Sequence, residues 1–354
     1  MRRGWSVIPF FSSNNVPEKR VSILIAARNE EENIGRTIDA ILAQHFPQDQ
    51  MELIIVDDHS TDRTAEIVKS YAGRGVKLLQ LAVGDKLNSY KKYAITKAIE
   101  MATGEIIVTT DADCRMGPNW LNTVVNYFEQ NDSFLVSSPV VYSEEKNWFE
   151  ELQTLEFLYL IGLGAAGIGN GKPTTCNGAN LAYRRDVFFE LGGFKGIDNL
   201  ASGDDELFLH KVAEKYSDKI GFCKSREAIV YTDAKPNLTS FISQRKRWAS
   251  KSTKYKDKKV VVLGLCIWLF NLALICSVLL FVILLPVVNS LILLAFGIKI
   301  LVEMLFMLPV LSFANRNSLI KYLPMLSIVH TVYLVYIGIA GNIGKYDWKG
   351  RQVN

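Results

Sequence analysis

Runs of β-branched and other apolar residues alternate with amphipathic stretches between residues 21 and 142. Continuous apolar runs are typical of strands buried on both faces, and apolar residues three or four positions apart are typical of helices. The pattern predicts strands at 21–27, 53–56, 76–81 and 106–110, and helices at 30–44, 62–71, 91–101 and 118–129. This alternation predicts an α/β domain with a mostly parallel sheet covered by helices.

A second, continuous apolar pattern fills the C-terminal part of the chain. The 39 residues from Val260 to Ile298 contain no charged residue. As one helix they would reach about 58 Å at ~1.5 Å per residue, roughly twice the thickness of a bilayer core, so the run is expected to fold back at 286–290. Hydrophobic segments are predicted at about 260–285, 291–313 and 322–343. Basic residues flank the third segment on both sides, so it either spans or is re-entrant or interfacial.

Two further stretches carry weaker signals. Residues 148–168 are long and apolar, which favours core packing over an amphipathic helix near the bilayer. The first 20 residues hold a short run from Trp5 to Phe11 that is too short for a signal peptide. A flexible arm is the favoured interpretation, and a segment lying on the membrane surface is the alternative.

The charges separate the two parts of the chain. Of 40 Lys and Arg and 36 Asp and Glu, residues 260–354 hold only 6 and 2, so residues 1–259 are neutral (34 against 34). A neutral main domain argues against nucleic acid as a partner. Residues 244–259 carry eight basic residues and one acid, and the positive-inside rule therefore places residues 1–259 in the cytoplasm. The chain is expected to be an integral membrane protein of the plasma membrane, or of the inner membrane if the source is bacterial. The five cysteines show no metal-ligand spacing and are expected to be free thiols.

Pairs of carboxylates end two of the predicted strands. Asp57-Asp58 follows the second strand, and Asp111-Ala-Asp113 follows the fourth. The carboxyl ends of parallel strands meet at one edge of the sheet, where ligands of α/β proteins bind. Two carboxylates two residues apart on an extended chain point the same way, and Mg²⁺ or Mn²⁺ prefers such oxygen ligands shared with substrate phosphates.

Five segments together resemble family 2 of the glycosyltransferases. They are Val-Ser-Ile-Leu-Ile-Ala-Ala-Arg-Asn-Glu at 21–30, Val-Asp-Asp-His-Ser-Thr-Asp at 56–62, Asp-Ala-Asp at 111–113, Gly-Asp-Asp-Glu-Leu at 203–207 and Gln-Arg-Lys-Arg-Trp at 244–248. The resemblance covers residues 20–250 and implies a GT-A fold, a nucleotide-sugar donor with UDP as the usual nucleotide, a divalent metal and inversion at the anomeric carbon.

The resemblance also implies roles for individual residues. Asp111 and Asp113 would hold the metal, Asp111 also facing the ribose, and Asp58 would contact the nucleotide base beside Glu30 and the backbone of Ala27. Lys91 resembles a donor-binding lysine, although Tyr90 replaces the glycine that precedes it in relatives.

The pair Asp204-Asp205 resembles the segment that carries the general base of the family. The choice between the two is open, with Asp205 modestly favoured, and two acids that cap the following helix are the alternative. Gln244, Arg247 and Trp248 form a Gln-x-x-Arg-Trp pattern in which Arg grips the diphosphate and Trp faces the sugar or acceptor. An interfacial membrane anchor is the other interpretation of that pattern.

Three further segments carry weaker signals. Asn177-Gly-Ala-Asn180 resembles an acceptor-side segment or is an ordinary turn. Lys299 and Glu303 lie four residues apart in the second span and are expected to pair. The tail segment Trp348-Lys-Gly-Arg351 inexactly resembles an element of polysaccharide synthases that returns to the catalytic site.

The sequence therefore predicts an N-terminal arm (1–20), a GT-A domain (21–250), a basic juxtamembrane linker (251–259), a helical membrane region (260–343) and a tail (344–354). The expected function is inverting transfer of a sugar from a nucleotide sugar to a hydroxyl or phosphate of a membrane-associated lipid or glycan, such as a polyprenyl phosphate, a diacylglycerol or a ceramide-like lipid. A processive polysaccharide synthase and a catalytically silent membrane scaffold are the alternatives. A sugar nucleotidyltransferase is disfavoured, because residues 26–32 contain no glycine.

Overall fold

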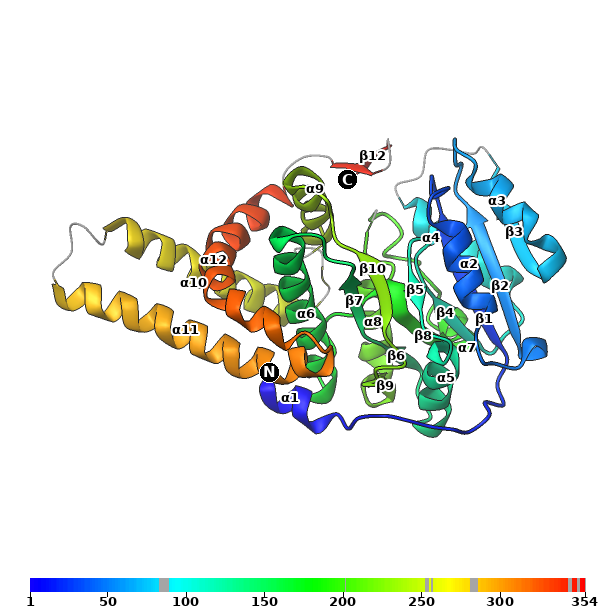
Figure 1. The fold of residues 1–354 in the computed structure, drawn as a ribbon, viewed down its shortest axis with the longest axis horizontal. Coiled ribbons are helices and arrows are strands. Elements are labelled where there is room, and N and C mark those ends of the chain that lie inside the picture. The colour runs from blue at the N-terminus through cyan, green and yellow to red at the C-terminus, as the bar shows by residue number, and fades with distance from the viewer. Residues whose placement is uncertain are drawn as a thin grey trace.

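The computed structural model describes residues 1–82, 89–200, 202–251, 255, 257–280, 286–342, 346–348 and 351–353. Its centre is a seven-stranded sheet in the order β3-β2-β1-β4-β8-β6-β9 (Figure 1). In chain order these strands are β1 (Val21–Ala27), β2 (Met51–Asp57), β3 (Val76–Gln80), β4 (Ile106–Thr109), β6 (Leu135–Ser137), β8 (Leu181–Arg184) and β9 (Ile220–Phe222). Strand β8 is antiparallel to its neighbours β4 and β6, and the other neighbouring strands run parallel. The predicted mostly parallel α/β sheet is confirmed.

Helices cover both faces of this sheet, because successive side chains of each strand point to opposite faces. Ile23 and Ile25 of β1 belong to the core on one face, and Leu24 belongs to the core on the other. The first face is covered by α2 (Ile34–Leu42), α3 (Thr64–Ser70) and α5 (Trp120–Gln130). The second is covered by α4 (Tyr90–Met101), α7 (Arg185–Glu190) and α8 (Glu206–Tyr216).

A smaller sheet lies beside the main one. It has the order β5-β10-β7, with β5 at Arg115–Met116, β7 at Val140–Ser143 and β10 at Val230–Asp233. Strand β10 leads into α9 (Leu238–Ala249), which carries the Gln-Arg-Lys-Arg-Trp segment. Short 3-10 turns η1 (Gln48–Gln50), η2 (Ala72–Arg74), η3 (Gly178–Asn180) and η4 (Ser217–Lys219) complete the α/β domain.

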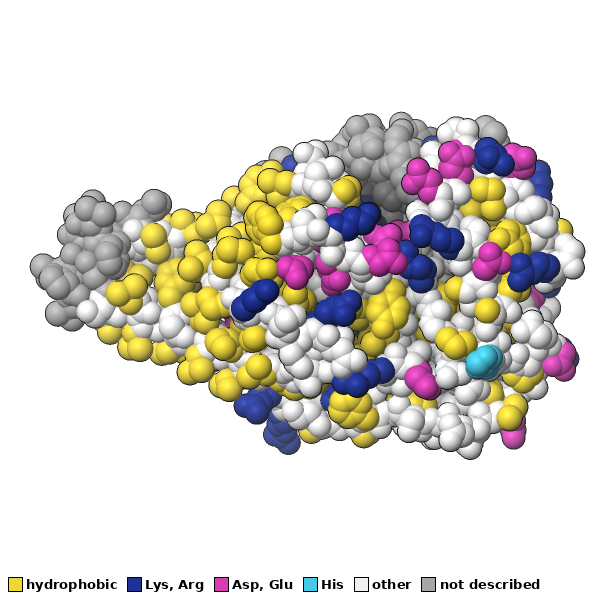
Figure 2. Space-filling view, viewed as in Figure 1, with side chains coloured by type: hydrophobic (Ala, Val, Ile, Leu, Met, Phe, Trp, Pro, Cys, Tyr) yellow, Lys and Arg dark blue, Asp and Glu magenta, His cyan; other side chains and the backbone are white. Residues whose placement is uncertain are grey.

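The predicted membrane region, whose helices are called the membrane helices below, consists of α10 (Lys258–Leu280), α11 (Pro286–Phe313), η6 (Asn317–Tyr322) and α12 (Leu323–Ala340). Helices α10 and α11 project away from the sheet, and α12 packs on both of them and on α9 (Figure 1). Hydrophobic side chains gather on the surface of the projecting part (Figure 2). By length and composition, four described helices could cross a membrane: Trp148–Gly169, Lys258–Val278, Ser290–Phe313 and Asn317–Ala340.

The first of these four, α6 (Trp148–Gly169), lies inside the protein. It packs against α1, β7, α11 and α12, and 61% of its apolar window is buried. Gly162 allows this contact, because a Cβ there would lie 3.0 Å from Val310 Cγ2 of α11. Core packing, favoured for residues 148–168, is confirmed.

The prediction of a flexible N-terminal arm is wrong for its first residues. They form a short helix, α1 (Arg2–Val7), whose Trp5 side chain is buried against Phe222 and Phe313. Lys224 Nζ donates to the carbonyl oxygens of Trp5 and Ile8. The aromatic run therefore packs between the α/β domain and the end of α11, because burying Trp5 and satisfying those carbonyls stabilises one position.

The predicted turn at 286–290 is also wrong. Pro286 is the first residue of α11, so residues 286–290 lie within a helix; residues 281–285, which precede it, lie outside the described part. Proline suits the first position of a helix, where its missing N–H leaves no hydrogen bond unmade. Parts of the predicted linker (252–254 and 256) and tail (344–345, 349–350 and 354) also lie outside the described residues.

Glu52 at the start of β2 generates a prediction about stability. Its carboxylate accepts hydrogen bonds from Ser22 Oγ (2.5 Å), Lys77 Nζ (2.6 Å) and Thr103 N (2.6 Å), so it joins neighbouring strands. Burial alone would raise the pKa of Glu52, but these partners lower it to about 2. A lowered carboxyl pKa stabilises the fold above the ordinary pKa, and this contribution is lost as pH falls towards 2.

We expect Glu52→Gln to lower the free energy of unfolding by about 1.5–3 kcal/mol at pH 7, because it weakens charge-assisted hydrogen bonds. Thermal unfolding of the detergent-solubilised protein between pH 7 and pH 3 measures this effect. The difference in melting temperature between wild type and variant should shrink as the pH falls. Glu105→Gln is the control, since Glu105 forms an ion pair with Lys19 at a side chain that is 62% exposed. A difference that does not change with pH would contradict the assigned role of the charge.

Candidate active site

The candidate site lies at the edge of the main sheet where β1, β2 and β4 end. A cavity of about 1180 Å³ opens there and continues to the membrane helices. Seven of the nine residues predicted to bind the donor line it, together with both candidate bases: Glu30, Lys91, Asp111, Asp113, Gln244, Arg247, Trp248, Asp204 and Asp205. The structure therefore brings together segments that are up to about two hundred residues apart in sequence.

Asp111 lies in the loop after β4, and a lysine holds its carboxylate. Lys91 Nζ of α4 lies 2.8 Å from Asp111 Oδ1 and 3.3 Å from Asp204 Oδ2. Burial would raise the pKa of Asp111, but Lys91, with a smaller contribution from Arg247, lowers it. The pKa of Lys91 is raised in turn, because the two carboxylates outweigh its own burial. The carboxylates gathered here thus stabilise a positive charge between them.

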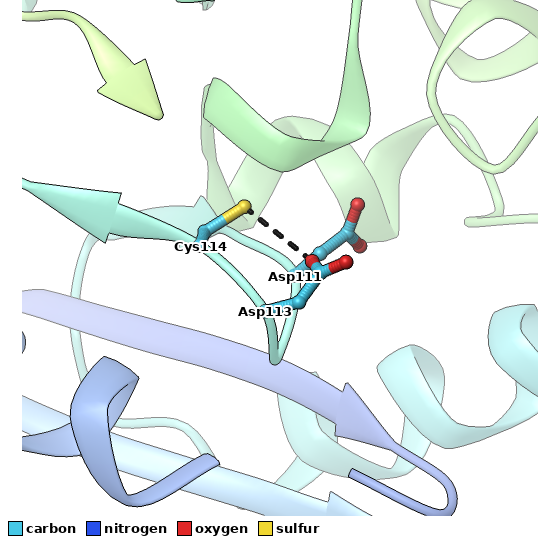
Figure 3. Close-up of side chains that lie close together, drawn as sticks. All are labelled: Asp111, Asp113 and Cys114. Atoms are coloured by element: carbon cyan, nitrogen blue, oxygen red, sulfur yellow. Dashed lines mark hydrogen bonds between the residues drawn. The ribbon is translucent and has the colours of Figure 1, made fainter. Parts of the chain in front are cut away.

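This arrangement fits a divalent cation. Asp111, Asp113 and Cys114 lie on one tight loop, and their ligand atoms are within 4.8 Å of one another (Figure 3). Burial raises the pKa of the Cys114 thiol well above its usual value, and its Sγ lies 3.9 Å from Asp113 Oδ1. A neutral thiol is a poor ligand for Mg²⁺ or Mn²⁺, whereas two carboxylates are good ones. Asp111 and Asp113 are therefore the residues that could hold a metal.

The two adjacent acids Asp204 and Asp205 lie in different surroundings. Asp205 Oδ1 accepts from the backbone N–H of Glu206 (2.7 Å), so Asp205 caps α8, and its Oδ2 accepts from the N–H of Gly178 (2.9 Å). Burial would raise the pKa of Asp205, but nearby Lys251 and these backbone donors lower it to about 2. Asp204 Oδ2 lies 3.3 Å from Lys91 Nζ, and both residues line the cavity. The helix-capping interpretation thus applies to Asp205.

Two buried lysines support this loop. Lys251, the first residue of the basic linker, lies 2.6 Å from Glu206 Oε2 and 3.5 Å from Asp205 Oδ1. Lys92 Nζ donates to the carbonyl oxygens of Leu200 and Ser202, the latter at 2.8 Å. Sequence reasoning missed both residues, because a lysine in an amphipathic helix or in a basic cluster carries the same signal as a solvated one.

Arg245 organises the Gln-Arg-Lys-Arg-Trp segment from within the protein. Its guanidinium forms a buried ion pair with Glu156 of α6, donates to Gln244 Oε1 (2.6 Å) and lies 4.2 Å from the centroid of the Trp248 ring. Trp248 in turn packs on Phe157, with centroids 5.9 Å apart. Sequence reasoning singled out Gln244, Arg247 and Trp248 and passed over Arg245, which positions two of them.

The predicted base-binding residues Ala27 and Asp58 are adjacent but do not line the described cavity. The N–H of Asp58 donates to the carbonyl oxygen of Ala27 (2.8 Å), and Asp58 Oδ1 lies 2.9 Å from His59 Nδ1. Arg28 donates to the carbonyl oxygens of Asp58 and His59. Glu30 does line the cavity, and α2 begins four residues later, so Glu30 is not at the helix terminus considered in the sequence.

The Asn177–Asn180 segment lies beside the two acids at one residue and packs in the core at another. A Cβ at Gly178 would lie 3.4 Å from Asp204 Oδ2 and 3.3 Å from Asp205 Cβ, so glycine lets the backbone approach both acids. Asn180 is a core residue whose side chain bonds to Trp120 Nε1 (3.0 Å) and to two carbonyl oxygens.

In the tail, β11 (Tyr346–Trp348) and β12 (Arg351–Val353) pair as antiparallel strands, and β11 packs beside α9.

Comparison with known proteins agrees with these motifs. The model of the family described as glycosyl transferase family 2 matches residues 22–192. The chain is 28% identical to the glucosyl-dolichyl phosphate glucuronosyltransferase of Haloferax volcanii over 183 residues, which are 49% of this chain and 56% of that protein. It is 32% identical to the beta-monoglucosyldiacylglycerol synthase of Nostoc sp. (strain PCC 7120) over 230 residues, which are 65% of this chain and 48% of that protein.

A solved structure extends the likeness to nearly the whole fold. The mannosyltransferase PcManGT of Pyrobaculum calidifontis, in complex with GDP-Man and Mn²⁺, aligns over 93% of this chain and 92% of its own with a TM-score of 0.57 and 19% identity. The chain spans about half the length of the curated relatives that it matches. Residues 22–192 belong to family 2 of the glycosyltransferases, with a GT-A fold, as the motifs predicted.

The buried Arg245–Glu156 pair generates the first prediction from the site. We expect Glu156→Gln to destabilise the protein by about 3–5 kcal/mol, because it leaves a buried guanidinium without its counter-ion. Thermal unfolding followed by tryptophan fluorescence measures the loss. Glu144→Gln is the control, since Glu144 lies 3.6 Å from Arg115 with a side chain that is 67% exposed. Equal melting temperatures for Glu156→Gln and wild type would contradict the role of the pair.

The loop that carries Asp111 and Asp113 generates the second prediction from the site. Asp111→Asn and Asp113→Asn should each weaken Mn²⁺ binding by at least about tenfold, because each removes a charged oxygen ligand. Cys114→Ser should leave Mn²⁺ binding unchanged, because the thiol is neutral. Electron paramagnetic resonance of free Mn²⁺ during titration measures binding without any turnover. Loss of binding in Cys114→Ser would instead make the sulfur a ligand.

Proposed function

We propose that this family 2 domain transfers a sugar from a nucleotide-sugar donor to an acceptor that approaches from the membrane. The observation that carries the proposal is the single cavity shared by Asp111, Asp113 and Asp204 at the sheet edge and by α10, α11 and α12. An acceptor held among the membrane helices can extend into this cavity and meet the donor at the catalytic carboxylates.

The donor would lie at the sheet edge. Arg247 lines the cavity and contributes to lowering the pKa of Asp111. The Arg247 guanidinium is therefore placed to bind the diphosphate. A Mg²⁺ or Mn²⁺ ion held by Asp111 and Asp113 would stabilise the negative charge of the departing nucleoside diphosphate. We propose that Asp58 and Glu30 contact the nucleotide base of the donor, with UDP as the expected nucleotide.

Asp204 is the better candidate for the general base. A base must accept a proton from the acceptor hydroxyl as the oxygen attacks, and its efficiency falls when its pKa lies far below the working pH. Asp205 has a pKa lowered to about 2, and backbone donors occupy both of its oxygens. We therefore propose Asp204 as the base and Asp205 as the residue that holds the loop, which reverses the preference drawn from sequence.

The domain would face the cytoplasm. The support for this side is the basic cluster at the end of α9 and the start of α10: Lys246 and Arg247 lie in the last turn of α9, and α10 begins with Lys258 and Lys259. Nucleotide sugars are then supplied on the same side as the site.

A transfer assay with Asp204→Asn and Asp205→Asn tests this assignment. Purified protein is incubated with Mn²⁺, a panel of radiolabelled nucleotide sugars and membrane lipids, and products are extracted into organic solvent. Asp204→Asn should lose about 10²–10⁴-fold in rate, because general-base catalysis contributes that much. Asp205→Asn should keep a larger share of the rate and should lower the melting temperature, because Asp205 caps α8.

Other results would change the assignment. A larger rate loss in Asp205→Asn than in Asp204→Asn would make Asp205 the base. Label only in a long water-soluble polymer would indicate a polysaccharide synthase. Mn²⁺ binding without turnover of any donor would indicate a silent scaffold.

A further inference from the structure

The membrane side of the cavity has a long apolar wall. It is formed by residues of four helices: Leu160, Ile161 and Leu163 of α6, Ile267 and Phe270 of α10, Ala295, Ile298 and Val302 of α11, and Leu334 and Ile337 of α12. An apolar slot that opens among membrane helices fits hydrocarbon chains. The Val302 side chain lines this slot and is 59% exposed, so it lies where the slot opens to the outside.

The charged groups along the slot are arranged in pairs. Lys299 Nζ lies 2.8 Å from Glu303 Oε1 and donates to Ser327 Oγ (2.7 Å) and to the Ser327 carbonyl oxygen (3.1 Å), so its three protons are used. Arg245 pairs with Glu156. Among the described lining residues of α6, α10, α11 and α12, the charged side chains are Glu156, Lys299 and Glu303. That wall therefore presents no unpaired cation from these helices.

The whole cavity has a surplus of negative charge. Its described lining includes nine carboxylates and seven Lys or Arg side chains. A divalent cation and a nucleoside diphosphate would roughly cancel each other there, so the surplus would persist when the donor is bound. A lipid phosphate would add to this surplus, which is unfavourable because the lining carboxylates already outnumber the lining Lys and Arg side chains.

One buried polar side chain in the slot offers a hydrogen-bond acceptor to a ligand. Asn271 of α10 is 2% exposed and lines the cavity; its Nδ2 donates to the Ile267 carbonyl oxygen. Its Oδ1 has no hydrogen-bond partner within the described part of the chain. A buried acceptor of this kind suits a ligand with a hydrogen-bond donor, such as a hydroxyl or amide N–H, and repels a phosphate oxygen.

We infer that the acceptor is an uncharged lipid whose reacting group is a hydroxyl, and that a lipid phosphate is excluded. This inference rests on the proposed function. The acceptor oxygen forms a bond to the anomeric carbon as the bond between that carbon and the diphosphate oxygen breaks. The hydroxyl proton passes to the Asp204 carboxylate, and the nucleoside diphosphate leaves with the bonding electron pair.

A matched pair of lipids tests the inference. Diacylglycerol and phosphatidic acid with identical acyl chains differ only in hydroxyl against phosphate. Photoreactive forms of both are incorporated at equal mole fraction into phosphatidylcholine nanodiscs that contain the full chain without donor. We expect diacylglycerol to label peptides of α6 and α10–α12 at least about tenfold more than phosphatidic acid, because an unpaired buried charge is strongly disfavoured. Equal labelling, or preferred labelling by phosphatidic acid, would overturn the inference.

Turnover is measured separately with the same nanodiscs, with a monoglucosylated diacylglycerol and a polyprenyl phosphate added as further acceptors. Transfer to the neutral lipids supports the inference, and transfer to the polyprenyl phosphate overturns it. Selective labelling by diacylglycerol without any transfer would sink the proposed function while leaving the lipid preference of the cavity standing, so the two failures are distinguishable.

Two substitutions locate the effect in the slot. Val302→Trp should fill the opening and raise the KM for the neutral lipid at least about fivefold, because bulk at the mouth blocks entry. Leu305→Trp is the matched control, since Leu305 is exposed on the same helix and is not among the lining residues. Glu303→Gln should leave Lys299 without its counter-ion and raise labelling by phosphatidic acid. No change in either variant would show that lipids bind elsewhere.

Discussion

The buried ion pair between Arg245 and Glu156 joins α9, which carries the Gln-Arg-Lys-Arg-Trp segment, to α6. Each charge is too costly to bury alone, so the two must stay together, and α9 and α6 are held in one relative position. Arg245 also holds Gln244 and lies over the Trp248 ring. Because α6 packs on α11 and α9 packs on α12, the same contact sets where the membrane helices stand relative to the carboxylates.

A second constraint is the crowding of carboxylates at the sheet edge. Lys91 lies between Asp111 and Asp204, and Lys251 lies between Asp205 and Glu206, so each lysine screens one pair of acids. Neighbouring acids in the chain thereby acquire different properties. Asp205 accepts from two backbone N–H groups and lies near Lys251, whereas Asp204 lies near Lys91, so the two adjacent acids have different partners.

Much of the α/β domain could be predicted from the sequence. Strand β1 has the predicted bounds, and the other predicted strands and helices of residues 21–142 are present with ends shifted by a few residues. The errors have identifiable causes. The N-terminal helix is held by contacts with Phe222, Lys224 and Phe313, which are distant in sequence. The turn was predicted at 286–290, although proline begins helices readily and Pro286 is the first residue of α11.

The sequence by itself determined the sheet, the positions of the carboxylates at strand ends and the apolar helices, because periodicity and strand-end chemistry are local properties of the chain. The tertiary structure decided which partners each of two adjacent acids contacts, that Arg245 is buried within its motif, and that the membrane helices line the same cavity as both acids. These depend on partners that are distant in sequence: Gly178 lies 27 residues from Asp205, and Glu156 lies 89 residues from Arg245. Burial and ion pairing change the role of a residue, and neither can be read from its neighbours in sequence.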